Sequence, residues 1–222
     1  MSDISAIGVA SVSRTLLAER AYEELRDRLV TLQIKPGEPI DEDLIRQQLR
    51  MGRTPIREAI KRLALENLVN VFPRRGTFAA EINITDLADI TDVRSVLEGH
   101  AAFLAAQRLT PARALELAVL AAEVTASRGS DDTAALMALD TRVHRFIYAA
   151  AANPLLAETL LAYYNLSVRI WYLVIDRVPQ LFARVHEHAD LLDAIANGRA
   201  ELAREIVTVH VATFEREVRS VL

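Results

Sequence analysis

Asp140 and His144 are the first of four residues whose types could hold a metal ion. They lie four residues apart, so on a helix their side chains point in the same direction. The same helical face carries the apolar residues Met137, Ile147 and Ala151, which predicts that it faces the interior. Burying an unpaired polar group is costly, so two metal-capable groups on an inward face need an explanation. We therefore treat this pair as candidate metal ligands.

Two later histidines, His188 and His210, complete the candidate set. Each lies on the apolar side of an amphipathic segment, and the turn signal Asn197-Gly198 separates the two segments. The turn comes about ten residues after His188 and about twelve before His210, so the two come roughly level in an antiparallel helix pair. One carboxylate and three imidazoles suit a divalent transition metal, for which we expect zinc, nickel or manganese. Each histidine taken alone is equally compatible with a hydrogen-bonded core residue.

The other histidines considered, His100 and His186, do not share this pattern. His186 is two residues from His188 and therefore points in another direction on the same helix. We expect both to be surface or structural residues, which makes them controls for the metal site.

Residues 41–76 have the pattern of a winged helix-turn-helix. Thr54 is a good N-cap for the second helix, and Pro55 fits its first helical position. The apolar residues of this helix define one face, and three cations repeat every four residues on another, namely Arg53, Arg57 and Lys61. A short helix that buries one side and exposes a row of cations suits insertion into a DNA groove. The alternative is an ordinary solvated basic face.

A β-hairpin is expected directly after this helix. Two short strands, at residues 68–71 and 77–80, are joined by a loop in which proline and glycine supply the turn. We expect this hairpin to be the wing of the motif. The predicted DNA contacts from the turn, the helix and the wing are Arg50, Arg53, Thr54, Arg57, Arg74, Arg75 and Gly76.

The charge of the chain is divided unevenly. The formal net charge of the whole chain is −4, which by itself argues against a nucleic-acid partner. Residues 14–80, however, carry 13 basic and 10 acidic side chains, whereas the rest of the chain carries 13 and 20. This asymmetry predicts a DNA-binding domain at residues 14–80 joined to an acidic domain at residues 85–222.

Composition excludes several classes of protein. The chain has no cysteine, so it can form neither a disulfide framework nor a thiolate metal site. No apolar run approaches the roughly 20 residues that a membrane span requires. The first 13 residues lack the features of a secretory signal, and we expect them to form a loose tail. These observations predict a cytoplasmic protein that does not associate with membranes.

The expected fold is mainly α-helical. Before the wing, helices are predicted at residues 19–32, 41–49 and 54–67. After it, turn signals such as Thr110-Pro111 and Asn153-Pro154 separate six predicted helices, at residues 85–109, 111–128, 131–152, 154–178, 181–197 and 199–221. Short loops between long helices predict antiparallel neighbours. We therefore expect an N-terminal winged helix-turn-helix with a small β-hairpin wing, followed by an all-α antiparallel six-helix bundle.

The predicted winged helix-turn-helix, which we call the reading head because it would contact DNA bases, resembles that of the GntR family of bacterial transcription regulators. The resemblance rests on residues 41–60, followed by Leu63, Leu68-Val69, Pro73 and Arg75-Gly76. The helical remainder resembles the FadR-type effector domain of that family, called FCD, and six helices rather than seven would place it in the VanR-like subgroup. One departure is Met51-Gly52, where family members usually have Val-Ser. Gly52 removes a hydroxyl that could touch DNA.

The resemblance implies roles for the residues of both halves. Arg53, Thr54 and Arg57 would enter the major groove of DNA, and Arg75-Gly76 would enter the minor groove. FCD domains commonly carry an Asp-x-x-x-His pair and two later histidines in this order, which supports the metal assignment. One such DNA-binding domain buries too little surface for a tight and specific complex, so we expect a homodimer that binds palindromic operator DNA.

Arg94 and Glu98 match the Arg-x-x-x-Glu signature of FCD domains. Four protein ligands leave two positions open on an octahedral ion, which a carboxylate or hydroxyl of a small metabolite could fill. Arg94 could anchor such a carboxylate through a two-pronged fork, or it could pair with Glu98 one turn along. Further candidates for the effector pocket, chosen by helix phase, are Tyr164, Asn165 and Arg169.

We expect a ligand-responsive transcriptional repressor that binds a small carboxylate metabolite, and not an enzyme. One alternative is a metal-dependent hydrolase with an accessory DNA-binding domain. No His-Glu-x-x-His pattern, nucleophile elbow or glycine-rich phosphate loop supports it, and catalytic zinc usually has three protein ligands. A second alternative is a regulator whose metal is purely structural.

Overall fold

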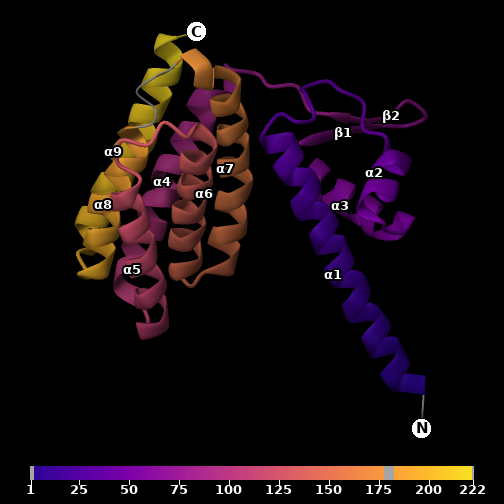
Figure 1. Cartoon of the computed structure of the whole chain (residues 1–222), viewed down its shortest axis with the longest axis horizontal. Helices are drawn as coiled ribbons and strands as arrows, with labels where there is room; N and C mark the ends of the chain where they lie inside the picture. Colours follow the sequence, from indigo (N-terminus) through magenta and orange to yellow (C-terminus); the bar gives the residue numbers. More distant parts are fainter. Residues whose placement is uncertain (1–2, 178–182, 222) are drawn as a thin grey trace. The chain divides into compact units, whose positions relative to one another are not determined.

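A computed structural model describes residues 3–177 and 183–221 of the chain (Figure 1). The chain divides into two compact units. The first comprises the chain up to Asn83 together with residues 168–173, and the second comprises residues 84–167 and 174–222. Among the described residues, no helix is both long enough and apolar enough to cross a membrane.

Three helices and a hairpin form the main part of the first unit. They are α1 (Asp3–Val30), α2 (Glu42–Leu49), α3 (Arg53–Leu65), β1 (Val69–Phe72) and β2 (Gly76–Ala79). The apolar face of α3 is buried as predicted, with Ile56, Ile60 and Leu63 at most 4% exposed. α3 packs against α1, whose residues Leu25 and Leu29 are fully buried. This packing fixes which side of α3 remains available to a ligand.

The N-terminal segment differs from the prediction. Residues 3–13, expected to belong to a loose tail, are helical, and α1 begins at Asp3 rather than at residue 19. No proline occurs before Pro36, so nothing in this stretch prevents the helix from extending toward the N-terminus.

The start of α3 also differs from the prediction. Gly52 is the N-cap, with φ −73° and ψ 174°, so the prediction of Thr54 as the N-cap is wrong. Pro55 becomes the third helical residue, which is still within the first turn, where a backbone N–H has no intrahelical acceptor. The turn between α2 and α3 places the left-handed conformation at Arg50, with φ 53° and ψ 43°. The glycine of this turn is therefore not the residue with positive φ.

β1 and β2 form the antiparallel hairpin expected for the wing. Each strand is shifted by one residue from the predicted limits, 68–71 and 77–80. The N–H of Ile40 donates to the carbonyl oxygen of Thr77 at 2.8 Å, so the segment before α2 borders β2. The hairpin is thus attached to the helix-turn-helix through main-chain hydrogen bonds.

Within the described residues, six α helices follow the wing, as predicted. They are α4 (Asp86–Arg108), α5 (Pro111–Ala126), α6 (Thr133–Ala150), α7 (Pro154–Val174), α8 (Ala183–Ala196) and α9 (Ala200–Ser220). A 3₁₀ turn at Ile175–Arg177 follows α7. The predicted limits at Val178 and Leu181 lie outside the described residues.

The predicted stop signals act as helix caps. The side chain of Thr110 accepts from the N–H of Arg113, and that of Asn153 accepts from the N–H of Leu156, both at 3.3 Å. A proline follows each cap at the start of its helix. Gly198 has φ 66° in the turn between α8 and α9. These local signals explain why the helix limits could be predicted closely.

α4 and α9 approach each other closely. A Cβ atom added at Gly99 of α4 would lie 2.9 Å from Oγ1 of Thr208 and 3.2 Å from Cγ of Arg204, both on α9. The lack of a side chain at Gly99 therefore allows the two helices to pack tightly. This packing holds two residues of the site, Glu98 on α4 and His210 on α9, in the same part of the bundle.

Candidate metal centre and nucleic-acid interface

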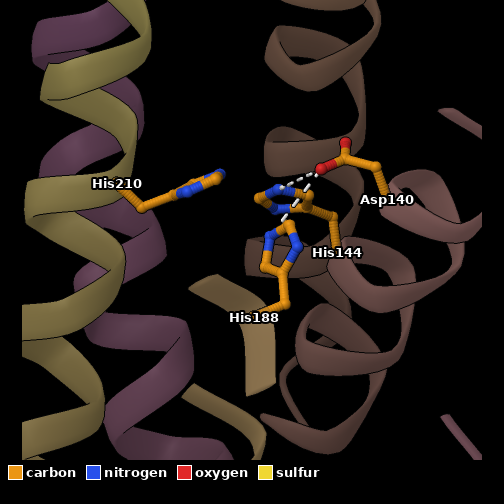
Figure 2. Close-up of side chains that lie close together, drawn as sticks. All are labelled: Asp140, His144, His188 and His210. Carbon is orange, nitrogen blue, oxygen red and sulfur yellow. Dashed lines mark ion pairs between the residues drawn. The ribbon is translucent and has the colours of Figure 1, made fainter. Parts of the chain in front are cut away.

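Asp140, His144, His188 and His210 meet inside the helical bundle (Figure 2). One possible ligand atom from each residue lies within 4.8 Å of the corresponding atoms of the other three. All four side chains are buried. The structure thus brings together every residue of the candidate metal site.

Three helices position these four side chains. Asp140 and His144 lie one turn apart on α6, while α8 carries His188 and α9 carries His210. Oδ1 of Asp140 is 3.8 Å from Nε2 of His144 and 3.7 Å from Nε2 of His188 (Figure 2). The ring centroids of His188 and His210 are 4.6 Å apart. The ring nitrogens and one carboxylate oxygen therefore surround a common point.

The hydrogen bonding of the cluster fits a bound ion. Among the described residues, Oδ1 of Asp140 and Nε2 of His188 have no hydrogen-bond partner. Buried polar atoms are rarely unpaired, so these atoms call for a partner. Two ligand atoms at about 2.1 Å from one ion lie roughly 3–4 Å apart, so the cluster needs only a small contraction to bind one.

Residues outside the cluster orient two of its members. The hydroxyl of Tyr164 donates to Oδ2 of Asp140 at 2.7 Å, which leaves Oδ1 directed toward the histidines. Nδ1 of His144 lies 3.0 Å from Oε2 of Glu98, whereas its Nε2 lies 3.8 Å from Oδ1 of Asp140, so Nε2 is the nitrogen that the cluster can use. Metal sites in proteins typically hold the far atom of each ligand in this way.

His210 has a similar partner, which the sequence analysis missed. Its Nδ1 lies 3.2 Å from Oε2 of Glu187, a residue of α8. Glu187 directly precedes His188 in the sequence, and that proximity is the only sequence signal that could have indicated it. The contact leaves Nε2 of His210 for the centre of the cluster.

Arg94 and Glu98 form a buried ion pair beside the cluster. Nε of Arg94 is 2.6 Å from Oε1 of Glu98, and Nη1 donates to Oγ of Ser167 at 2.5 Å. Burial raises the pKa of Glu98, but the charge of Arg94 outweighs it and lowers that pKa to about 2. With neutral imidazoles, one arginine and the carboxylates of Glu98 and Asp140 give a formal charge of −1, which favours a cation.

His188 is neutral at pH 7. Burial holds the pKa of its imidazole well below the usual value, and the neighbouring His210 and His144 lower it further. Metal ions bind the neutral form of histidine. The environment of His188 thus favours the protonation state that a metal requires.

The candidate residues for effector binding differ in the contacts that they make in the structure. The Arg94–Glu98 ion pair, one of the two roles considered for Arg94, is present. Asn165 is buried, and its Nδ2 has no hydrogen-bond partner among the described residues. Arg169 instead donates from Nη2 to the carbonyl oxygen of Ala80 at 2.7 Å, within the first unit. Burial lowers the pKa of Arg169 to about 10.

The row of cations predicted on α3 lies on its exposed face. The side chains of Arg53, Arg57 and Lys61 are 76%, 73% and 72% exposed. Arg53 lies 3.8 Å from Asp43, and Arg57 lies 3.9 Å from Glu42. Exposed pairs at these distances contribute little free energy and are easily exchanged for phosphate or base contacts. Arg50 and Thr54 are also exposed.

Arg62 belongs to α3 but is engaged elsewhere. Its guanidinium carbon lies 3.6 Å from the centroid of the Tyr22 ring, and it pairs with Glu19 and Glu66. The hydroxyl of Tyr22 donates to Glu66 at 2.8 Å. Burial, followed by the charge of Glu66, raises the pKa of Tyr22 to about 12. This network joins α1 to α3, so Arg62 has a structural role.

Three predicted wing residues, Arg74, Arg75 and Gly76, are exposed at the hairpin turn. Arg74 and Gly76 adopt positive φ, 63° and 103°. The Arg75 guanidinium lies 5.9 Å from the centroid of the Phe72 ring, which packs edge-on against Phe78. The two arginines are therefore presented at the tip of a hairpin braced by aromatic side chains.

Both halves of the chain match known protein families. Residues 17–79 match the family of bacterial regulatory proteins called the gntR family. Residues 89–213, more than half of the chain, match the FCD domain.

Individual relatives are also transcription regulators. An HTH-type transcriptional regulator of Agrobacterium vitis is 34% identical over 146 residues, which cover 64% of this chain and 85% of the relative. A probable repressor of a D-xylose utilization operon from Paenarthrobacter nicotinovorans is 28% identical over 207 residues, covering 91% and 89%. The structure of Escherichia coli McbR/YncC has a similar fold, with a TM-score of 0.80 at 22% identity, covering 92% of this chain and 97% of that one.

Proposed function

Because this chain belongs to the GntR family of bacterial regulatory proteins and carries an FCD domain, we propose that it regulates transcription in response to a metabolite bound at a metal. DNA-binding transcriptional regulation follows from the family itself, and the relatives are regulators rather than enzymes. The hydrolase alternative thus has no support. The finer points of the proposal are the metal, the effector and the dimer.

The two halves of the chain have different functions in this proposal. Residues 14–80 read the operator, and residues 85–222 bind the effector and form the dimer. One reading head contacts too little DNA for tight and specific binding, whereas two related by a two-fold axis match a palindromic site. We expect a repressor that acts in the bacterial cytoplasm, where its operator is accessible.

Arg53, Thr54 and Arg57 carry the reading of the major groove. Their support is the exposed face of α3, whose opposite face is buried against α1. Arg50 contacts the backbone beside this groove. In the wing, Arg75 and Gly76 enter the minor groove, and Arg74 contacts a phosphate group. An arginine that pairs with a guanine edge contributes about 1–3 kcal/mol of discrimination.

Asp140, His144, His188 and His210 hold a divalent transition metal. The observation that carries this proposal is the buried cluster in which Asp140 Oδ1 and His188 Nε2 lack hydrogen-bond partners among the described residues. When bound, the metal supplies open coordination positions for carboxylate or hydroxyl oxygens. Asn165 supplies a further hydrogen-bond donor for such an effector. The Arg94–Glu98 pair adjusts the charge of the pocket.

Elemental analysis of purified variants tests the metal site. We expect His144→Ala, His188→Ala and His210→Ala each to lower the content of zinc, nickel and manganese. The variants His100→Ala and His186→Ala are controls, because neither residue belongs to the cluster. An equal loss of metal in all five variants would overturn the assignment.

The effector is a small carboxylate that loosens the protein from DNA. The linker between the reading head and α4, residues 81–85, contains no glycine or proline, so a shift of α4 is transmitted along the chain. A ligand changes DNA affinity only if it binds one arrangement of the protein more tightly than another, typically by about 1–3 kcal/mol. By reciprocity, the operator must weaken binding of the effector by the same factor.

Calorimetry of a panel of short mono- and dicarboxylates, with and without operator DNA, measures this coupling. We expect at least one acid to bind more weakly when the operator is present. Identical affinities in the two titrations would show that the pocket does not control DNA binding. Removing the metal with a chelator distinguishes a structural metal from one that binds the effector. Loss of a structural metal would unfold the bundle, whereas loss of an effector-binding metal would abolish only the response to the effector.

A further inference from the structure

The helix α5 carries an exposed apolar face. Leu115 and Val119 are 74% and 57% exposed, although each is a large hydrophobic residue. Ala118 and Ala122 extend this face at helical spacing and are also exposed. The opposite side of α5, including Leu120, is buried in the bundle. α5 is therefore apolar on two sides, of which only one is covered by the described part of the chain.

A groove of about 380 Å³ lies beside this face, between α5 and α6. Its apolar lining consists of Val119, Leu120, Phe146 and Ala149. Val119 belongs both to the exposed face and to the groove. A ridge of apolar side chains and a groove able to receive such a ridge thus lie next to each other on one surface.

The rim of the groove carries charges of both signs. Its charged lining residues are Arg113, Glu116, Arg142 and Arg145. Arg113 pairs with Glu116 at 2.6 Å, and Arg142 pairs with Glu123. These pairs are largely exposed and can be exchanged for equivalent pairs with another molecule at little cost. When such a surface contacts a second copy of itself, carboxylates of one copy can pair with arginines of the other.

We propose that a second copy of this chain docks on the α5 face, with Leu115 and Val119 of each copy inserted into the α5–α6 groove of the other. The inference rests on the dimer of the proposed function and names its surface. A two-fold interface must be self-complementary, so ridge and groove have to lie together on the same patch. Because the rim carries both signs of charge, such a contact can pair Glu116 of one copy with an arginine of the other.

The apolar lining of the groove disfavours nucleic acid as its occupant, because Val119, Leu120, Phe146 and Ala149 offer no hydrogen bond to phosphate groups. A different protein as occupant is an outcome that the following experiments distinguish, since it would leave self-association independent of α5.

Sedimentation velocity at micromolar concentration tests the surface. In Val119→Arg, a charge replaces the centre of the ridge, and we expect the dimer dissociation constant to rise at least 100-fold. Arginine has a higher helix propensity than valine, so α5 itself is not weakened. Val209→Arg on α9 is the matched control, because Val209 is 63% exposed and lies outside the α5 face. We expect this control to remain dimeric, with an unchanged thermal unfolding curve in both variants.

Cross-linking provides a second readout. Since the chain has no cysteine, a single introduced cysteine can form a disulfide only between two copies. Disulfides require Cα atoms about 4.4–6.8 Å apart, so we expect Ala118→Cys or Ala122→Cys to oxidise to a linked dimer and Val209→Cys to remain unlinked.

The outcomes separate the two levels of the proposal. A dimeric Val119→Arg, or cross-linking only at position 209, would overturn the α5 surface and leave the proposed dimer in place. A wild-type protein that sediments as a monomer would overturn both the surface and the dimeric part of the proposed function.

Discussion

Tyr164 donates a hydrogen bond of 2.7 Å to Oδ2 of Asp140 and thereby determines which oxygen of this carboxylate faces the three histidines. Both side chains are buried. Burial, followed by the charge of Asp140, raises the pKa of Tyr164 well above its usual value, so the hydroxyl remains a donor at any physiological pH. The contact joins α7 to α6 at the candidate metal centre.

Tyr164→Phe removes this hydrogen bond while keeping the ring. We expect metal affinity to fall about 10- to 100-fold, the usual effect of losing a partner that orients a ligand. Competition with a chromophoric chelator measures the change. Tyr163→Phe is the matched control, since it removes a hydroxyl from the neighbouring residue, which is not a member of the cluster. Equal affinity of the two variants would show that Tyr164 does not orient Asp140 for metal binding.

The depressed pKa of His188 predicts a pH-dependent stability of the metal-free protein. In the folded state His188 stays neutral, whereas in the unfolded chain it gains a proton below about pH 6.5. The unfolded state then binds more protons, so the free energy of unfolding decreases as the pH falls through this range. We expect His188→Gln to show a shallower decrease.

Urea unfolding in the presence of chelator, from about pH 8 to pH 5, measures this effect. His100→Gln is the control, because His100 is exposed, and it should keep the slope of the wild type. Parallel curves for the wild type and His188→Gln would contradict the prediction.

Two arginines of the same helix should have opposite phenotypes. Arg57→Ala should weaken operator binding by about 1–3 kcal/mol through lost base contacts, with little change in stability. Arg62→Ala should lower the free energy of unfolding by about 1 kcal/mol, because it loses the stacking on Tyr22 and the exposed ion pairs. Its DNA affinity should be close to that of the wild type.

Gel-shift titration with an operator selected from a random DNA pool, together with urea unfolding, measures both quantities. If Arg62→Ala lost DNA affinity as strongly as Arg57→Ala without losing stability, the proposed orientation of α3 on DNA would be wrong.

Replacing Arg50 with glycine is expected to raise the stability of the fold and to weaken DNA binding. Its left-handed conformation, with φ 53°, is unfavourable for a residue with a Cβ atom. Arg50→Gly relieves this strain, partly offset by the greater freedom of the unfolded chain, so we expect a gain of up to about 1 kcal/mol. DNA affinity should fall because a cation is lost.

Arg50→Ala is the matched control for this trade. It removes the same charge but keeps the unfavourable conformation, so it should lose DNA affinity with no gain in stability. A stability gain of equal size in Arg50→Ala would show that the charge, and not the backbone, is responsible.

Local patterns in the sequence were sufficient to predict most of the elements. Helix limits at Thr110 and Asn153 depend on caps and prolines within one turn of the chain, and the structure agrees with them. The convergence of His188 and His210 could also be predicted, because helical rise and a short turn determine which residues come level. These inferences need no knowledge of how distant helices pack.

Where two local signals competed, the prediction failed. Thr54 and Gly52 are both acceptable N-caps, and only the folded turn, with its left-handed Arg50, places the start of α3 at Arg53. The helical state of residues 3–13 was missed because a weakly patterned segment offers no period from which to predict a helix.

Tertiary structure decided the partners of each charged side chain. The sequence by itself determined that Arg57 and Arg62 share a helix, but only packing against α1 shows that Arg62 meets Tyr22. Likewise, it determined the four candidate metal ligands, but not that Tyr164 and Glu187 hold their far atoms. The physical reason is that helical periodicity fixes the direction of a side chain from its own helix, whereas its partner depends on the register between helices that are distant in the chain.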